Sequence, residues 1–332
     1  LAGVDIGIVP IFDGSLEEEL QKQNCLAWPA ALFEETAIEV ATMVDYNEEM
    51  LKNRVSRLKL MNAAVMKKPK NAQISEYSEK DMFTIVPEED GTVIRKKKLL
   101  KSLNHAITNL QDDLSLEEEG CYKEPEITAD SKELKTLRDE LNHYVKTKVT
   151  YQFGEEEEVL DGGEISKWIS VNDERHVEIS REQIAAYVER LADTYDTAGK
   201  TKKIKTSYGK KVDIEGGDYG WRIDREKETE ALAALIAEGR EEVREPEYEK
   251  RANNPGRKDY GDTYVEVNLT AQHLIYYKNG QMVLESDFVS GNEAKGWSTP
   301  TGAFGLYYKE RNRTLRGQGY ASPVSFWMPF NG

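Results

Sequence analysis

Two stretches of the chain carry apolar residues three or four positions apart, with charged residues between them. The first runs from Glu48 to Leu60 and the second from Arg181 to Tyr195. This spacing predicts two amphipathic helices, each of which lays one apolar stripe on a sheet. Ser180 stands just before the second stretch and Gln183 three residues later, a pattern that favours the start of a helix.

The same order of elements follows each stretch: a strand, a second amphipathic helix, and an exit that contains Pro and Tyr. In the first half, residues 83–86 precede a helix around residues 99–107 that exits at residues 122–125. In the second half, residues 219–223 precede a helix around residues 232–236 that exits at residues 245–248. A further strand is expected at residues 149–154, ahead of the second copy. A strand-and-helix plan that occurs twice predicts two repeated α+β modules.

The C-terminal part of the chain follows a different period. Residues 264–269 alternate in polarity, and the apolar runs 274–277 and 282–284 flank Asn279-Gly280. Alternation predicts strands, and Asn-Gly between two strands is the strongest local signal for a tight hairpin. The fold class predicted for the whole chain is therefore α+β, with two modules followed by a mainly-β segment.

Residues 249–261 separate the second module from the β-segment. They include Asn253-Asn254-Pro255-Gly256-Arg257 and show no apolar period, which is typical of an exposed linker. The alternative is an ordered strap docked between the two parts. A flexible linker would let the β-segment swing, whereas a strap would fix it.

Charge excludes some partners. The 332 residues contain 61 acidic and 45 basic side chains, a formal net charge of -16, which disfavours nucleic acid and anionic lipid as partners. No apolar run reaches the roughly 18 to 20 residues that span a bilayer. Contact with a membrane is therefore expected only through an anchor outside this chain. The acidic run 155–158 is expected at a solvated hairpin tip, and the basic stretch 200–205 on ordinary surface.

Thiols and imidazoles are few. Cys25 and Cys121 are too few for a disulfide framework and have no metal-binding spacing. We expect both to be structural, since a buried Cys usually packs as a small apolar residue. The alternative is a Cys25–Cys121 disulfide in an oxidising compartment. A catalytic thiol needs a nearby base or cation, and none of the four histidines stands at a spacing that fixes such a pair. These are His105, His143, His176 and His273.

The chain resembles the L,D-transpeptidases, the cysteine enzymes that cross-link bacterial peptidoglycan. Thr299-Pro300-Thr301-Gly302 and Trp327 to Gly332 match stretches that precede the catalytic His in that family. The repeats resemble the peptidoglycan-binding domain that often occurs in tandem ahead of it, most clearly at residues 151–154, 167–171 and 217–221. The catalytic His and the Ser-His-Gly-Cys stretch are not among the 332 residues. Both are expected beyond Gly332, so the chain looks truncated before its catalytic residues.

The resemblance implies a division of the chain and a set of site residues. Residues 1–127 form a first, N-terminally incomplete repeat, residues 128–248 a second repeat, residues 249–261 the linker, and residues 262–332 the N-terminal part of the catalytic domain. No residue of the chain is expected to be catalytic. Eight side chains are expected to line the substrate cleft, and they are Thr299, Pro300, Thr301, Gly302, Trp327, Met328, Phe330 and Asn331.

What the resemblance implies for function is acyl transfer through a cysteine thioester, from a tetrapeptide-stem donor to an acceptor amine. It implies no metal and no organic cofactor, and an extracytoplasmic location in the cell wall or at the bacterial surface. The expected partners are peptidoglycan stem peptides and its glycan. The chain by itself is expected to be inactive. The alternative is a non-catalytic wall-binding or scaffold protein in which the repeats carry the function.

Overall fold

The chain forms two structural units. The computed structural model describes residues 3–11, 14–22, 43–256, 258–317 and 319–331. One unit comprises residues 1–75 and 85–135, and the other residues 76–84 and 136–332. Cys25, Arg257 and Gly332 lie outside the described residues, so the predictions that involve them stay predictions.

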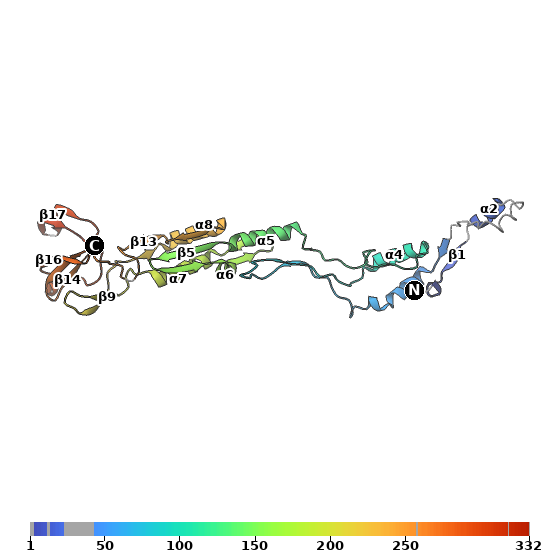
Figure 1. The fold of residues 1–332 in the computed structure, drawn as a ribbon, viewed down its shortest axis with the longest axis horizontal. Coiled ribbons are helices and arrows are strands. Elements are labelled where there is room, and N and C mark those ends of the chain that lie inside the picture. Colours follow the sequence, from blue (N-terminus) through green and yellow to red (C-terminus); the bar gives the residue numbers. More distant parts are fainter. Residues whose placement is uncertain (1–2, 12–13, 23–42, 257, 318, 332) are drawn as a thin grey trace. The chain divides into compact units, whose positions relative to one another are not determined.

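The first unit contains short helices and two strand pairs (Figure 1). Its helices are α1 (Gly3–Ile6), α2 (Ser15–Lys22), α3 (Glu48–Ser56), η2 (Lys59–Met61) and α4 (Lys96–Thr108). Its antiparallel pairs are β1 (Val9–Ile11) with β2 (Met43–Asp45), and β3 (Gln73–Ile74) with β4 (Ile85–Val86). The helix α5 (Lys132–Val145) crosses the boundary between the units.

The helix predicted from residue 48 to residue 60 is present but shorter. Asn47 caps it by accepting a hydrogen bond from the Met50 N–H, and it ends at Ser56. Leu58 is extended, with ψ 140°, which breaks the α-helical ladder before the 3-10 turn η2. Leu51 and Val55 face a small core that also contains Leu99 from α4. The apolar spacing therefore identified the buried stripe, although not the length of the helix.

The second unit is built on a three-stranded sheet with order β12-β5-β6. Its elements up to residue 250 are β5 (Lys148–Phe153), β6 (Glu156–Leu160), α6 (Gly162–Ile165), η3 (Ser166–Trp168), β7 (Ile169–Val171), β8 (Val177–Ile179), α7 (Arg181–Tyr195), β9 (Lys202–Lys205), β10 (Lys211–Ile214), β11 (Arg222–Ile223), α8 (Arg225–Glu238), β12 (Glu241–Arg244) and β13 (Tyr248–Lys250). β12 runs parallel to β5, which brings together strands that are far apart in the sequence.

Helices α7 and α8 pack on each other and run alongside β5 (Figure 1). α7 begins and ends at the predicted residues, and the Ser180 hydroxyl accepts the Gln183 N–H at 3.3 Å. Ile184, Val188 and Leu191 lie at helical spacing and are at most 2% exposed. Burying such side chains stabilises the fold by about 1.5–3 kcal/mol each, so this face holds the helix to the sheet.

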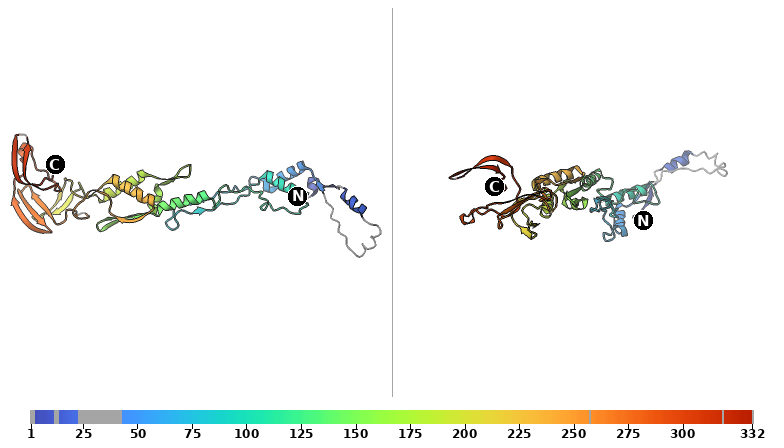
Figure 2. Two further views of the ribbon diagram at one scale, coloured as in Figure 1. Left: turned by 90° about the horizontal axis from the view of Figure 1, so that it is seen from above. Right: turned by 60° about the vertical axis from the view of Figure 1, so that its left-hand side comes forward.

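The C-terminal part of the second unit is all β apart from the 3-10 turn η4 (Glu293–Lys295). β14 (Tyr264–Asn268), β15 (His273–Lys278) and β16 (Gln281–Asp287) form one antiparallel sheet, and β17 (Glu310–Gly317) pairs with β18 (Tyr320–Trp327) in a separate hairpin (Figure 2). Asn279 and Gly280 both have positive φ, 52° and 77°, as the predicted tight hairpin requires.

The described residues of 249–261, here called the strap, are mostly exposed, and several of them make hydrogen bonds to the second repeat, as the alternative of a docked strap expects. Trp221 Nε1 donates to the Asn254 carbonyl at 2.6 Å, and the Asn253 N–H donates to Tyr219 Oη at 2.9 Å. Asp259 is fully buried and accepts hydrogen bonds from Lys202 and Thr197. These hydrogen bonds and the ion pair hold the strap to the second repeat.

The prediction of ordinary surface for residues 200–205 is also wrong at one position. Lys202 is only 6% exposed, because its ammonium forms an ion pair with the buried Asp259 carboxylate. The acidic run is at a hairpin as expected, and its last residue, Glu158, pairs with Tyr151 in the strand β5. Across the described stretches of chain, no helix combines the length and the apolar character needed to cross a membrane.

Candidate functional site

The stretch Thr299–Gly302 docks on the second repeat. The Ala303 N–H donates to the Gly216 carbonyl at 3.1 Å, and the Tyr219 N–H donates to the Ala303 carbonyl at 3.1 Å. Gly302 has φ 149°, and a Cβ there would stand 2.6 Å from the Gly216 carbonyl carbon. Glycine is thus required at this contact, since a side chain would force the two backbones apart. The docked stretch includes four of the predicted cleft residues.

The turn before it is fixed by Thr299, whose hydroxyl accepts the Gly291 N–H at 2.9 Å. Thr299 and Gly302 are half-buried, whereas Pro300 and Thr301 are exposed. Two of these four residues therefore present their side chains to solvent at the point where the segment meets the repeat.

The second predicted stretch, Trp327 to Asn331, lies against the residues that follow Gly302. Trp327 Nε1 donates to Tyr308 Oη at 3.3 Å, and the Phe330 and Phe304 ring centroids are 5.5 Å apart. The Tyr307 N–H also donates to the Pro329 carbonyl at 2.9 Å. The two predicted stretches are thus linked through residues 303–308. Met328 is 49% and Phe330 40% exposed, and Asn331 is exposed as well.

Many apolar side chains of the β-segment are exposed to solvent. In β16, Met282, Val283 and Leu284 are each more than half exposed, and so are Trp297 and Phe326. Among the described residues of 262–331, Ile275 is the one apolar side chain that is buried. An apolar edge strand of this kind is normally covered by further strands or by a partner.

Cys121 lies in the core of the first unit. It is 0% exposed, and its Sγ is 4.0 Å from the Ser102 hydroxyl, which donates to Glu119 at 2.7 Å. In the part of the chain that the structure describes, no imidazole contacts this thiol. Cys121 therefore packs as an apolar residue, in agreement with the prediction for it.

The four histidines are separate from one another. The His105 ring lies 3.1 Å from the amide of Asn109, the residue that caps the end of α4, His143 Nε2 lies 2.9 Å from the Ala237 carbonyl, and His176 Nδ1 lies 3.6 Å from Glu174. His273 on β15 has Asp287 at 2.8 Å and Glu285 at 3.3 Å across the strand pair. The hydrogen bond to Asp287 is the main cause that raises the pKa of His273.

Sequence reasoning missed the network that fastens the repeat to the β-segment. The Lys202 ammonium donates to Asp259 and to the Thr197 carbonyl, the latter at 2.7 Å. At the tip of the β9–β10 hairpin, the Ser207 hydroxyl donates to Glu266 at 2.6 Å and lies 2.8 Å from Tyr277 Oη. Lysines at 200, 202 and 203 look alike in sequence, so no local signal marks the buried one.

The sequence did not predict a pocket on the second repeat either, although two of its residues belong to patterns described above. Glu158 ends the acidic run, and Tyr187 lies one helical turn after Ile184, on the face predicted to be buried. Among the described residues, no three His, Cys, Asp or Glu side chains converge closely enough to hold a metal ion.

Two family models match this chain. The model described as "Putative peptidoglycan binding domain" matches residues 20–115 and again residues 127–244, and the model described as "L,D-transpeptidase catalytic domain" matches residues 262–329. The repeat matches together cover more than half of the 332 residues.

Solved structures with similar sequences are L,D-transpeptidases. The Ldtfm–avibactam carbamoyl enzyme is 35% identical over 60% of this chain and 78% of its own, with a TM-score of 0.49. A cysteine-to-serine mutant of the Enterococcus faecium L,D-transpeptidase is 34% identical over 58% and 78%, with a TM-score of 0.48. The E. faecium catalytic domain acylated by ertapenem is 46% identical over 21% and 57%, with a TM-score of 0.19.

A comparison with curated proteins gives no match. The family matches confirm the sequence resemblance for the repeats and for the β-segment alike. The chain therefore belongs to the family of proteins that carry this peptidoglycan-binding domain, with two copies of the domain ahead of a stretch that matches the L,D-transpeptidase catalytic domain.

Proposed function

We propose that this protein acts in peptidoglycan cross-linking, with the repeats binding the wall and residues 262–331 framing the substrate cleft of an L,D-transpeptidase. One observation carries the proposal: wall-binding repeats and catalytic-domain sequence stand in one chain, fastened to each other through Asp259, Glu266 and Ala303. A fastened repeat would hold the cleft at a fixed distance from the polymer that the repeat binds, which lowers the entropy cost of meeting the substrate.

In the proposed reaction, a Cys thiolate attacks the carbonyl between the third and fourth residues of a tetrapeptide stem. The bond to D-Ala breaks, D-Ala leaves as an amine that takes a proton from a His, and a thioester forms. The side-chain amine of a second stem then attacks the thioester and gives up a proton, which restores the thiol. Backbone amides beside the Cys would stabilise the oxyanion of each step.

Eight residues are proposed as one wall of this cleft. They are Thr299, Pro300, Thr301, Gly302, Trp327, Met328, Phe330 and Asn331. The contact between Phe304 and Phe330 and the exposure of Met328 support the proposal, because both stretches then border one accessible surface. Apolar and aromatic side chains with a few amides are the usual lining of a ligand site.

The nucleophile of this proposal is not one of the residues described above. The 332 residues contain no Ser-His-Gly-Cys stretch, and Cys121 is fully buried without a base. A buried thiol without a cation or imidazole partner is not activated. We therefore propose that the 332 residues alone do not catalyse acyl transfer.

The test is an acyl-transfer assay on the 332-residue chain. Incubation with a disaccharide-tetrapeptide donor and an acceptor amine should release no D-Ala, and a carbapenem should add no mass to the protein. The same chain joined to a catalytic half from a related L,D-transpeptidase should release D-Ala. D-Ala release by residues 1–332, or a carbapenem adduct at Cys121, would contradict the proposed roles.

The alternative function is a non-catalytic wall-binding or scaffold protein, and the buried state of Cys121 is the observation that favours it. Under this alternative the open apolar face of β16 would be a docking surface, and the fused chain of the previous test would stay inactive. Either function implies an extracytoplasmic location in contact with the wall, with peptidoglycan as the partner.

A further inference from the structure

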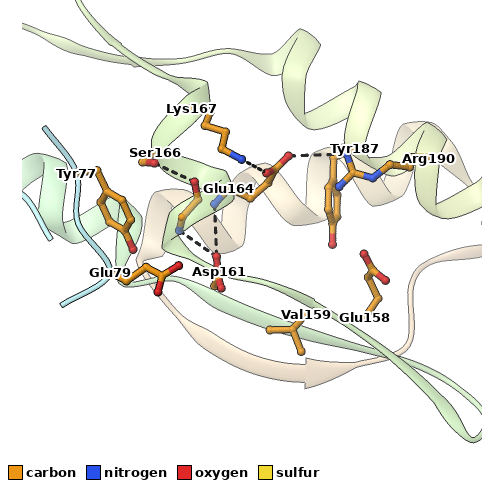
Figure 3. Close-up of a pocket in the computed structure, with 11 residues that line it drawn as sticks. Tyr77, Glu79, Glu158, Val159, Asp161, Glu164, Ser166, Lys167, Tyr187 and Arg190 are labelled. Atoms are coloured by element: carbon orange, nitrogen blue, oxygen red, sulfur yellow. Dashed lines mark hydrogen bonds and ion pairs between the residues drawn. The ribbon is translucent and has the colours of Figure 1, made fainter.

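An open pocket of about 620 Å³ lies on the second repeat (Figure 3). Its walls come from the end of β6, the α6 turn, the middle of α7, and the segment 76–84, which belongs to the same unit. The family match describes the repeat as a peptidoglycan-binding domain without naming residues, and this pocket is a concave site on it. Concave sites with a few convergent polar groups are the default places for ligands.

The pocket is acidic. Glu79, Glu158, Asp161 and Glu164 contribute four carboxylates, against two cationic side chains, Lys167 and Arg190. Both cations pair with Glu164, at 2.8 Å and 3.7 Å. Among the described residues, Glu79, Glu158 and Asp161 have no cation within ion-pair distance. The pocket therefore carries more negative than positive charge, and three of its carboxylates lack a counter-charge.

Tyr187 provides the second, independent observation. Its side chain is 2% exposed, and its hydroxyl is buried without a hydrogen-bond partner in the structure. Figure 3 shows this hydroxyl directed toward the side of the pocket where Glu158 lies. A buried hydroxyl that makes no hydrogen bond costs free energy, so its position calls for a ligand atom.

The orientation of Tyr187 is fixed from both sides. The Arg190 guanidinium lies over its ring at 4.7 Å from the centroid, and the Trp168 ring lies at 5.5 Å. Burial, followed by the charge of Glu158, raises the pKa of Tyr187, which keeps the phenol protonated. The hydroxyl is thus a preorganised group that can donate one hydrogen bond and accept another.

The chemistry of the pocket selects one ligand class. A net negative site repels anions, and the absence of three converging ligands among the described residues argues against a metal ion. Lys167 on Glu164 already shows an ammonium held by a carboxylate of the pocket. Val159 and the ring of Tyr77 add an apolar wall suited to an aliphatic chain.

We propose that this pocket binds a primary ammonium group on an aliphatic chain. The ammonium donates N–H bonds to the Glu158 carboxylate and to the Tyr187 oxygen, whose own hydrogen then turns to Glu158. Resting on the proposed function, the natural ligand is the side-chain amine of a stem peptide that has not yet been cross-linked. The repeat would then prefer wall that still holds acceptor amines over wall in which these amines are acylated.

The test is an NMR titration of the whole 332-residue chain with a small probe. Nα-acetyl-L-lysinamide carries the ammonium, and Nα,Nε-diacetyl-L-lysinamide is the matched probe without the charge. Saturable shifts of Tyr187, Glu158 and Asp161 signals with the first probe only are the expected result. Equal shifts with both probes, or saturation of the same signals by MgCl₂ instead, would overturn the assignment.

Two variants and one control sharpen the test. Tyr187→Phe removes only an unpartnered hydroxyl, so the fold should be kept while the probe affinity falls about tenfold, because a hydrogen bond from the charged ammonium is lost. Glu158→Gln should weaken the probe about tenfold, because a charged bond is lost. Glu182→Gln neutralises an exposed carboxylate on the same helix, outside the pocket, and should bind the probe like the wild type.

A thermal melt of each variant separates loss of the site from loss of the fold. An unchanged melting temperature with unchanged affinity in Tyr187→Phe would refute the role of the hydroxyl. Failure of the inference is distinguishable from failure of the proposed function. Wild-type protein that binds purified sacculi but does not respond to the ammonium probe keeps its wall-binding role and loses only the pocket.

Discussion

Lys202 and Asp259 form a buried ion pair that ties the second repeat to the strap 249–261. Their side chains are 5% and 0% exposed, and the Lys202 ammonium also donates to the Thr197 carbonyl. One Asp259 oxygen is buried without a partner in the structure. A buried charge pair of this kind is a poor source of stability as a whole, but each partner depends on the other.

Removing one partner of this pair should be costly. Asp259→Asn leaves the Lys202 ammonium buried without its counter-charge, and we expect a loss of about 3–5 kcal/mol in the free energy of unfolding, measured with urea. The double variant with Lys202→Met should recover part of the loss, since no charge remains to be desolvated. Asp262→Asn breaks the exposed pair with Lys258 and serves as the control that should leave the unfolding free energy unchanged. A similar loss of unfolding free energy in Asp259→Asn and in Asp262→Asn would contradict this expectation.

The close approach of the two parts at Gly217 can be tested separately. A Cβ at Gly217 would stand 2.0 Å from the Ala303 carbonyl oxygen, and Gly217 has φ 80°. Gly209 has nearly the same φ, 77°, but a Cβ there would meet nothing within 4 Å. Gly217→Ala and Gly209→Ala should share the backbone strain, about 1–2 kcal/mol, and only Gly217→Ala should release residues 299–303. Limited proteolysis should cut near these residues in Gly217→Ala alone, and equal cutting in both variants would refute the contact.

Glu228 makes the stability of the second repeat depend on pH. It is 0% exposed, accepts Tyr151 Oη–H at 2.5 Å and the Glu247 N–H at 2.7 Å, and pairs with Arg244 at 3.1 Å. Burial is the main cause that raises its pKa, against the hydrogen bonds that lower it. The folded state therefore binds the proton more tightly than the unfolded state.

Protonation of Glu228 should stabilise the folded protein at low pH. The contribution of Glu228 to stability should be fully present below the unfolded pKa of about 4.3 and should be lost as the pH rises through the raised folded pKa. Urea unfolding of the wild type and of Glu228→Gln over a pH series isolates it. Relative to the variant, the wild type should gain stability as the pH falls from 7. A gain on raising the pH would show that the charged form is the favoured one.

His273 should titrate above its usual value of about 6.5, because Asp287 accepts its hydrogen bond across β15 and β16. The support that this bond gives to the strand pair is complete below the unfolded pKa and is lost as the pH rises through the raised one. An NMR titration should show the imidazole pKa falling in Asp287→Asn and falling less in Glu285→Gln. Identical titration of wild type and Asp287→Asn would rule out the bond.

Local sequence patterns predicted the local elements of this fold. The first and last residues of α7 could be predicted because its cap, Ser180, and its apolar stripe are close together in the sequence. The β15–β16 hairpin follows from Asn279-Gly280, whose positive φ values few other residues accept. These signals require no knowledge of the rest of the chain.

Non-local contacts could not be predicted in the same way. Lys202 is buried by a partner 57 residues away, and β12 pairs with β5 across the whole module. The pocket depends likewise on Tyr77 meeting the turn at Asp161. Sequence patterns identified the two stretches of the expected cleft, which both lie near residues 303–308, while their part in substrate binding stays a prediction.

The measurement that tests the central claim most directly is co-sedimentation of the 332-residue chain with purified sacculi. We predict saturable binding that falls after the sacculus amines are acetylated, because wall binding is the role proposed for the repeats and free amines are the proposed ligand of the second. Recovery of the same amount of protein in the pellet with and without sacculi would contradict wall binding itself.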